Sequence, residues 1–257
     1  MKRPASPETA GIRVAVVQMP KTSLDRISHE ERQFFLLCGH VANEINVLNK
    51  LFYWASNFDE SEEIITRAHM AQSLVIGKLL TGKLWEAWKI IQQRFVRSNL
   101  SDDYRPSLED EAQTALKNLE RYFANKDNVV RKVRNWFAFH YDWRKIAAGY
   151  NDDLKDDDLY FYIGENHANS MYYASEVVVN TGMLESLVPG NRQRAFDLLV
   201  SDTTAVAGWL LSFINGCMVV GMDRHFDGLP PFKEVTIKGA PDMDDVRIPY
   251  FVYCSTA

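Results

Sequence analysis

Three polar residues in one short stretch of the chain have the chemistry to act on a phosphodiester. Arg134 and Asn135 are adjacent, and His140 follows within the same segment, Val130–Asp142. Arginine keeps its charge and presents a planar set of donors that matches phosphate oxygens. Histidine titrates near neutral pH and transfers protons, and an asparagine amide can orient either group. We therefore take Arg134, Asn135 and His140 as the candidate catalytic residues.

This stretch is also the basic part of an acidic chain. The 257 residues carry a formal net charge of −5. Residues 117–145 hold eight cations and three anions, a net charge of +5, which leaves −10 on the rest of the chain. A basic surface on an acidic protein fits a polyanion such as RNA, and the alternative is a charged, solvated helix face. The candidate RNA-binding residues are Arg131, Lys132 and Arg144.

The pattern Arg134-Asn135-x4-His140 resembles the signature of the HEPN superfamily, in which an arginine precedes a histidine by a few residues and a polar residue commonly follows the arginine. The segment Phe137–Asp142 is similar to an extended form of that motif, and the resemblance covers roughly residues 29–150. It implies a helical bundle that commonly dimerises with the motif at the interface. Many such proteins are metal-independent RNases, often toxins or abortive-infection effectors with a nucleotidyltransferase-like antitoxin, and others are non-catalytic.

Cleavage of RNA without a metal needs a base for the 2′-hydroxyl proton and a cation for the charge on the phosphorane. The resemblance gives these roles to His140 and Arg134, and it suggests Glu44 as an auxiliary carboxylate, with a surface carboxylate as the alternative. On an ideal helix, residues six apart differ by about 240° of rotation, so a distorted turn, the long arginine arm or a second protomer must bring the pair together. In the alternative interpretation His140 is buried and Arg134 pairs with a carboxylate such as Asp142.

The sequence predicts no cofactor and no metal site. His40 and Glu44 are four residues apart, as metal ligands on a helix can be, but nothing nearby completes a ligand set. The three cysteines, Cys38, Cys217 and Cys254, are widely spaced. Free thiols in a reducing compartment are therefore expected, and with them a cytoplasmic location.

The elements that position these residues are expected to be mainly helical. Apolar periodicity and caps predict helices from 28 to about 57, from about 59 to 96, from 107 to the turn at 125–128, from there to about 148, over 170–187, and from 191 through the uncharged run 203–222. Strand-like pieces at 12–18, 234–238 and 246–253 are expected to form a hairpin from the last two, with or without the first. The predicted fold is mainly α: an up-and-down helical bundle with a small β appendage from the N- and C-terminal segments. It is expected to be one domain over 1–257 with its core at about 29–225.

Three functions are compatible with this pattern. The leading one is an HEPN-like protein that cleaves or binds RNA, of toxin or defence type, with RNA, an antitoxin and a second copy as partners. The second is a non-enzymatic helical scaffold in which the same residues are structural. The third is a membrane-associated protein that uses residues 203–222, a run long enough to span a bilayer, although a buried helix is the expectation.

Overall fold

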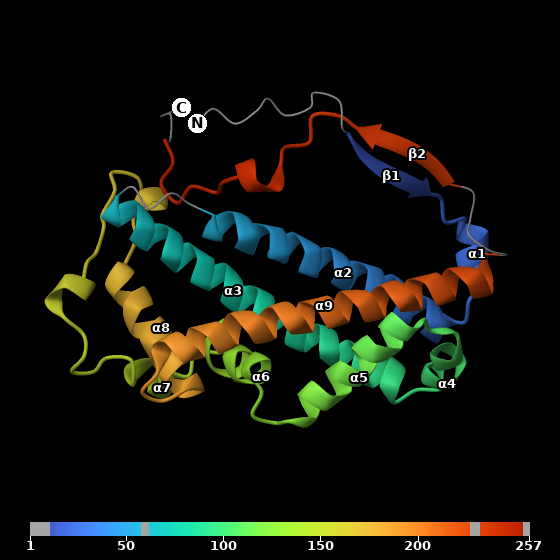
Figure 1. The fold of residues 1–257 in the computed structure, drawn as a ribbon, viewed down its shortest axis with the longest axis horizontal. Coiled ribbons are helices and arrows are strands. Elements are labelled where there is room, and N and C mark those ends of the chain that lie inside the picture. Colours follow the sequence, from blue (N-terminus) through green and yellow to red (C-terminus); the bar gives the residue numbers. More distant parts are fainter. Residues whose placement is uncertain (1–10, 58–61, 227–231, 254–257) are drawn as a thin grey trace.

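The structure, a computed structural model, describes residues 11–57, 62–226 and 232–253. It is an elongated bundle of helices with a small two-stranded sheet beside it (Figure 1). The predicted mainly helical fold with a β appendage from the two terminal segments is confirmed.

Three long helices run along the bundle: α2 (His29–Ser56), α3 (Glu63–Ile91) and α9 (Arg192–His225). A π-helical turn, Gln92–Val96, extends α3. The shorter elements are α1 (Lys21–Arg26), α4 (Leu100–Tyr104), α5 (Asp110–Ala124), α6 (Val129–Val133), a second π-helical turn (Arg134–Ala138), α7 (Trp143–Ala147) and α8 (Tyr173–Leu187).

Capping side chains fix where three of the helices begin. Ser28, Asn128 and Asn191 are the N-caps of α2, α6 and α9, and each side chain accepts the backbone N–H of the residue three positions later, at 3.3, 2.8 and 3.0 Å. Each cap satisfies a donor that the first turn of a helix leaves without an intrahelical partner. These three starts follow the predicted ones.

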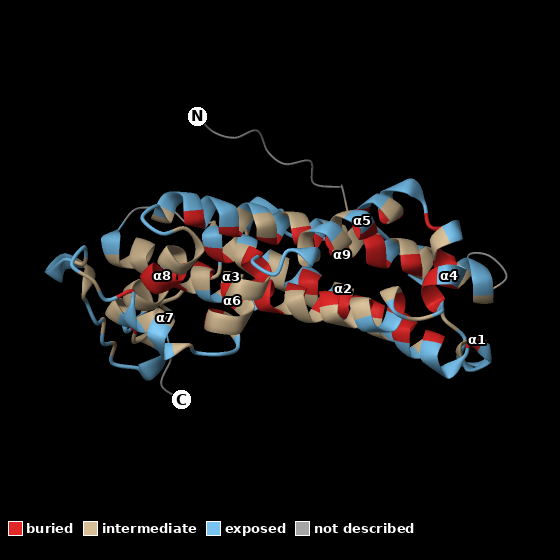
Figure 2. Ribbon diagram, turned by 90° about the horizontal axis from the view of Figure 1, so that it is seen from below, coloured by how far each residue is buried: buried red, intermediate tan, exposed pale blue. Residues whose placement is uncertain are grey.

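The core lies where α9 packs against α2, α3 and α5, seen as the buried band along the bundle in Figure 2. The uncharged run of α9 supplies much of it, through Val206, Ala207, Leu210, Phe213, Ile214, Cys217 and Val220. Gly216 allows α5 to approach, since a Cβ there would overlap Ala112. Two apolar residues of α3, Val75 and Leu79, are not part of the core, because both are about 40% exposed, and Val75 lines an open pocket.

Helix α9 contains residues 203–222, the uncharged run that is long enough to span a bilayer. Within the described residues it is the one helix long and apolar enough to cross a membrane, and 44% of its most apolar 18-residue stretch is buried inside the bundle. A core helix passes the same test of length and composition.

The sheet pairs the two terminal segments. β1 (Ile12–Val17) runs antiparallel to β2 (Phe232–Ile237), with Ile12 opposite Ile237. The predicted hairpin between the two C-terminal pieces is wrong, because residues 246–253 form no strand. All residues of both strands are exposed, so the ribbon stands apart from the core.

The predicted fourth helix differs from the observed one. It is continuous in the prediction from 129 to about 148, but in the structure it is α6, the π-helical turn Arg134–Ala138, a non-helical link and then α7. Asp142 explains the second start, because its side chain accepts the backbone N–H groups of Arg144 and Lys145 and so caps α7.

Candidate active site

The π-helical turn is anchored by apolar side chains below it. Val129, Val133 and Phe137 are buried in a small cluster with Met183 and Leu199. This burial holds one face of the turn against α8 and α9. The opposite face, which carries the polar residues, is left toward solvent.

Helix α3 comes unusually close to this turn at Gly82. A Cβ at Gly82 would lie 2.8 Å from the Phe139 ring and 3.1 Å from the Ala138 Cβ, closer than side chains normally approach. Glycine at this position therefore lets the end of the turn sit on α3.

The wider turn brings Arg134 and His140 together within one chain. Arg134 Nη1 lies 3.2 Å from His140 Nε2 and 3.1 Å from the Asn135 Oδ1, to which it donates a hydrogen bond. A π-helix winds with more residues per turn than an α-helix, and the chain leaves the helix after Ala138. The backbone thus removes the angular separation expected on an ideal helix, and this contact needs no second protomer.

A carboxylate on α3 holds the arginine. Glu86 Oε1 accepts a hydrogen bond from Arg134 Nε at 2.8 Å, and it lies 2.7 Å from Arg134 Nη2 in the same ion pair. The predicted alternative partner, Asp142, instead caps α7. Glu86 was not predicted from the sequence, since a half-exposed glutamate between Trp85 and Ala87 carries no spacing signal.

The auxiliary candidate Glu44 is joined to α3 by an ion pair. It pairs with Lys83 of α3, with Lys83 Nζ 2.6 Å from Glu44 Oε1, and its Oε2 lies 3.7 Å from His40 Nε2. Lys83 and Glu86 stand on the same face of α3, one helical turn apart. Glu44 therefore belongs to the surroundings of the site, while Glu86 contacts the arginine.

The arrangement is accessible and chemically competent. His140 is exposed, and the Arg134 side chain keeps 25% of its surface in water. The alternative of a buried His140 is thus contradicted. Because a guanidinium can only donate, His140 Nε2 is the acceptor in this contact and bears a lone pair. A ring nitrogen with a lone pair is the one that takes up a proton. Of the four other N–H groups of the arginine, three face Glu86 or Asn135, from Nε, Nη2 and Nη1, and a phosphate oxygen can replace either of these partners.

The three candidate RNA-binding residues differ in exposure and in their contacts. The Arg131 guanidinium lies over the Trp85 ring at 5.6 Å, and Arg144 lies over the Trp143 ring at 5.5 Å. Arg144 and Trp143 are exposed, whereas Arg131 and Lys132 are half-buried. Exposed rings beside cations are typical of surfaces on which single-stranded nucleic acid stacks.

No group of three or more histidine, cysteine or carboxylate side chains is arranged to hold a metal ion among the residues that the structure describes. Cys38 and Cys217 are buried free thiols, and Cys254 lies outside the described residues. Burial raises the pKa of Cys38 to about 12, so this thiol is not a nucleophile near neutral pH.

Comparison with known proteins adds no relative. No protein-family model, no curated protein and no solved structure matches this chain.

Proposed function

We propose that this protein is a metal-independent, HEPN-like endoribonuclease or RNA-binding protein of toxin or defence type. The observation that carries the proposal is the 3.2 Å approach of Arg134 Nη1 to His140 Nε2 at an accessible position. His140 takes the proton of the 2′-hydroxyl, whose oxygen attacks the adjacent phosphorus of the phosphate that Arg134 binds, and Asn135 orients the substrate. The bond from phosphorus to the 5′-oxygen breaks, which leaves a 2′,3′-cyclic phosphate and a 5′-hydroxyl that takes its proton from the protonated His140 or from water. The +5 charge of residues 117–145 supports an RNA substrate.

The test is RNA cleavage in EDTA by the wild type and by His140→Ala. His167→Ala is the matched control, because His167 is an exposed histidine in a separate 3-10 turn. We expect loss of general base catalysis to lower the rate by roughly 100- to 10,000-fold in His140→Ala and to leave His167→Ala unchanged. Equal cleavage by all three proteins, or none by the wild type, would refute catalysis.

Residual RNA binding separates cleavage from binding alone. Arg134→Lys keeps a positive charge but loses the planar set of donors. We expect it to bind RNA within a few-fold of the wild type while cleavage falls. If neither protein cleaves but both bind RNA with a strong salt dependence, the non-catalytic form of the proposal holds.

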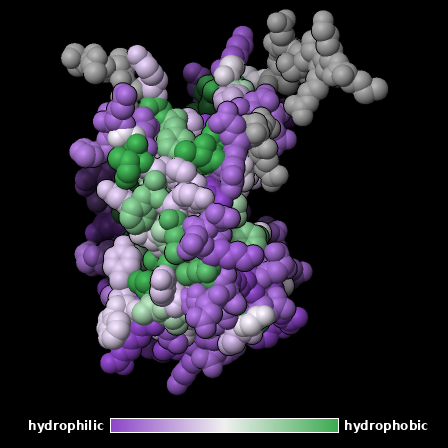
Figure 3. All heavy atoms as spheres, turned by 90° about the vertical axis from the view of Figure 1, so that its left-hand side faces the viewer, coloured by the Kyte–Doolittle hydropathy of each residue, from purple (hydrophilic) through white to green (hydrophobic). Residues whose placement is uncertain are grey.

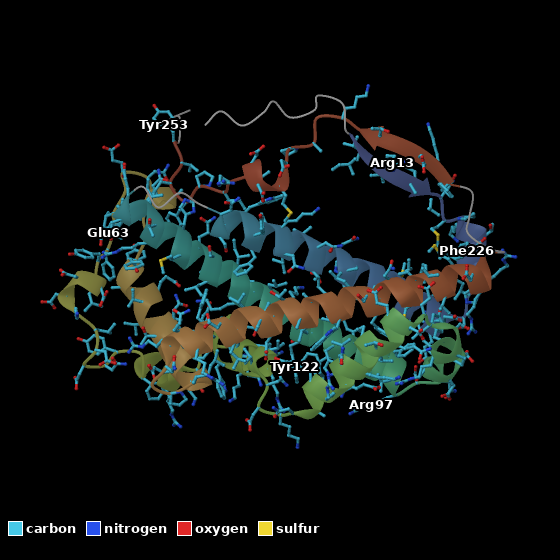
Figure 4. The ribbon with its side chains drawn as sticks, viewed as in Figure 1. Arg13, Glu63, Arg97, Tyr122, Phe226 and Tyr253 are labelled. Atoms are coloured by element: carbon cyan, nitrogen blue, oxygen red, sulfur yellow. The ribbon has the colours of Figure 1, made fainter. Side chains whose placement is uncertain are left out.

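A helical interaction protein is the second candidate, and exposed apolar surface favours it. The ribbon exposes Ile12, Val16, Phe232 and Ile237, each by about half. The end of the bundle seen in Figure 3 gathers apolar side chains among hydrophilic ones, and exposed residues of the loop there include Phe161 and Ile163. Tyr253, marked in Figure 4, is 97% exposed near the same end. Exposed apolar side chains of this kind mark protein interfaces, and the proposed partner in this alternative is another protein chain.

A further inference from the structure

A small cavity adjoins the Arg134 centre between α2 and α3. Its volume is about 240 Å³, and Glu86, which holds Arg134, forms part of its lining. Pockets for drug-sized ligands measure roughly 300 to 1,000 Å³. This cavity therefore has room for a group about the size of one base rather than for a whole nucleotide.

The walls and the rim of the cavity differ in chemistry. The walls are aliphatic and come from Leu37, Val41, Ile45, Ala87 and Ile90. The rim is polar, with His40 exposed and with the side chains of Glu44 and Lys83 31% and 38% exposed. Mostly apolar walls with a few convergent polar groups are typical of small-ligand sites, and a nucleobase, with apolar faces and a polar edge, matches this lining.

The rim carboxylate has capacity for a ligand. Glu44 Oε1 accepts from Lys83 at 2.6 Å, but Oε2 is 3.7 Å from His40 Nε2, which is beyond a hydrogen bond. Within the described residues, no donor lies at hydrogen-bond distance from Oε2. Each carboxylate oxygen has two lone pairs, so Glu44 can receive two parallel donors and still keep Lys83.

We propose that this cavity is a guanine-binding subsite that places the base next to the scissile phosphate of the RNA. Guanine is the one RNA base whose Watson–Crick edge has two adjacent donors, N1–H and N2–H, and these match the two oxygens of Glu44. The neighbouring O6 acceptor then faces the ammonium of Lys83. The inference rests on the proposed function, because Arg134 and His140 provide the site for the adjoining phosphate.

The test measures the Kd of the four nucleoside 3′-monophosphates, and of inosine 3′-monophosphate, for the full chain by calorimetry. All five probes carry the same phosphate, so their differences report the base. A lost bidentate base contact is worth roughly tenfold or more in affinity. We expect guanosine to bind at least tenfold more tightly than adenosine, cytidine or uridine, and inosine, which lacks the N2 amino group, to fall between them.

Variants assign the discrimination to the rim. Glu44→Gln keeps the shape of the side chain but loses the acceptor pair, and Lys83→Met removes the donor for O6. Both should reduce the preference for guanosine, whereas Glu120→Gln, which alters a comparable Arg105–Glu120 ion pair at 2.7 Å elsewhere, should not. A preference that survives Glu44→Gln, or equal binding of all probes, would overturn the assignment, provided that thermal unfolding shows folded variants.

This outcome is separable from that of the proposed function. His140 does not line the cavity, so His140→Ala should retain the guanosine preference while it loses cleavage. Cleavage by the wild type at every base with equal rate would leave the ribonuclease standing and refute the subsite. A guanosine preference without any cleavage would support the subsite and refute catalysis.

Discussion

The Glu86–Arg134 contact predicts that a single substitution separates activity from stability. Glu86→Ala removes the only acceptor that holds both Nε and Nη2 of Arg134 within the described residues, at 2.8 and 2.7 Å. The side chains are 42% and 25% exposed, so the pair is partly solvated and contributes no more than about 1 kcal/mol to stability. A catalytic group displaced by about 1 Å, however, can cost on the order of 100-fold in rate.

The assay compares RNA cleavage in EDTA with thermal unfolding. Glu120→Ala is the matched control, since its ion pair with Arg105 has the same 2.7 Å length and similar exposure but lies away from the site. Both variants should unfold within about 1 kcal/mol of the wild type. Only Glu86→Ala should lose rate, by roughly 10- to 100-fold in kcat with little change in KM.

A conservative variant distinguishes positioning from charge. Glu86→Gln retains an oxygen that can accept from Arg134, so we expect it to recover most of the lost kcat. The reasoning would be refuted if Glu86→Ala cleaved RNA at the wild-type rate, or if the two alanine variants lost activity equally.

Three further predictions concern the frame around the site. Gly182→Ala should destabilise the protein by about 1 to 3 kcal/mol in chemical denaturation, because the added Cβ would overlap the Lys145 carbonyl oxygen of α7. An unchanged denaturation midpoint would contradict this close contact between α7 and α8. Tyr122, marked in Figure 4, donates a hydrogen bond to the half-buried Asp202 at 2.6 Å. Tyr122→Phe should therefore lower the free energy of unfolding by about 1 to 3 kcal/mol, measured by thermal unfolding at pH 7. An equal loss in Asp202→Asn would support the assignment of this loss to the one hydrogen bond. The Gly190 N–H and then Arg192 lower the pKa of Glu185 from its ordinary value of 4.5, so its contribution to stability is present above that pH and is lost as the pH falls through the lowered value. Glu185→Gln should therefore flatten the fall in stability below about pH 4.5, and an unchanged acid profile would argue against it.

Much of the frame could be predicted from the sequence because caps and apolar periodicity act locally. Ser28, Asn128 and Asn191 each mark a helix start by a bond to a residue three positions away. The uncharged run of α9 was likewise expected to be core, and its apolar face is buried. These features depend on neighbours along the chain, so a single sequence contains the information.

The parts that were missed depend on contacts between distant segments. The break in the fourth helix follows from the cap at Asp142 together with the close approach of Gly82, which is far away in sequence. Glu86 meets Arg134 across 48 positions. The pairing of β1 with β2 rather than within the C-terminal segment is another long-range choice that local propensity does not settle.

The π-helical turn also makes the geometry depend on residue count rather than on residue identity. An ordinary α-helix advances about 100° per residue, so deleting one residue between Arg134 and His140 would restore the regular winding and swing the imidazole to another side of the helix. Every side-chain type of the motif would still be present in such a chain, yet its acid–base centre would be dismantled. An arginine and a histidine at the right spacing are thus informative only together with the local winding of the backbone that joins them.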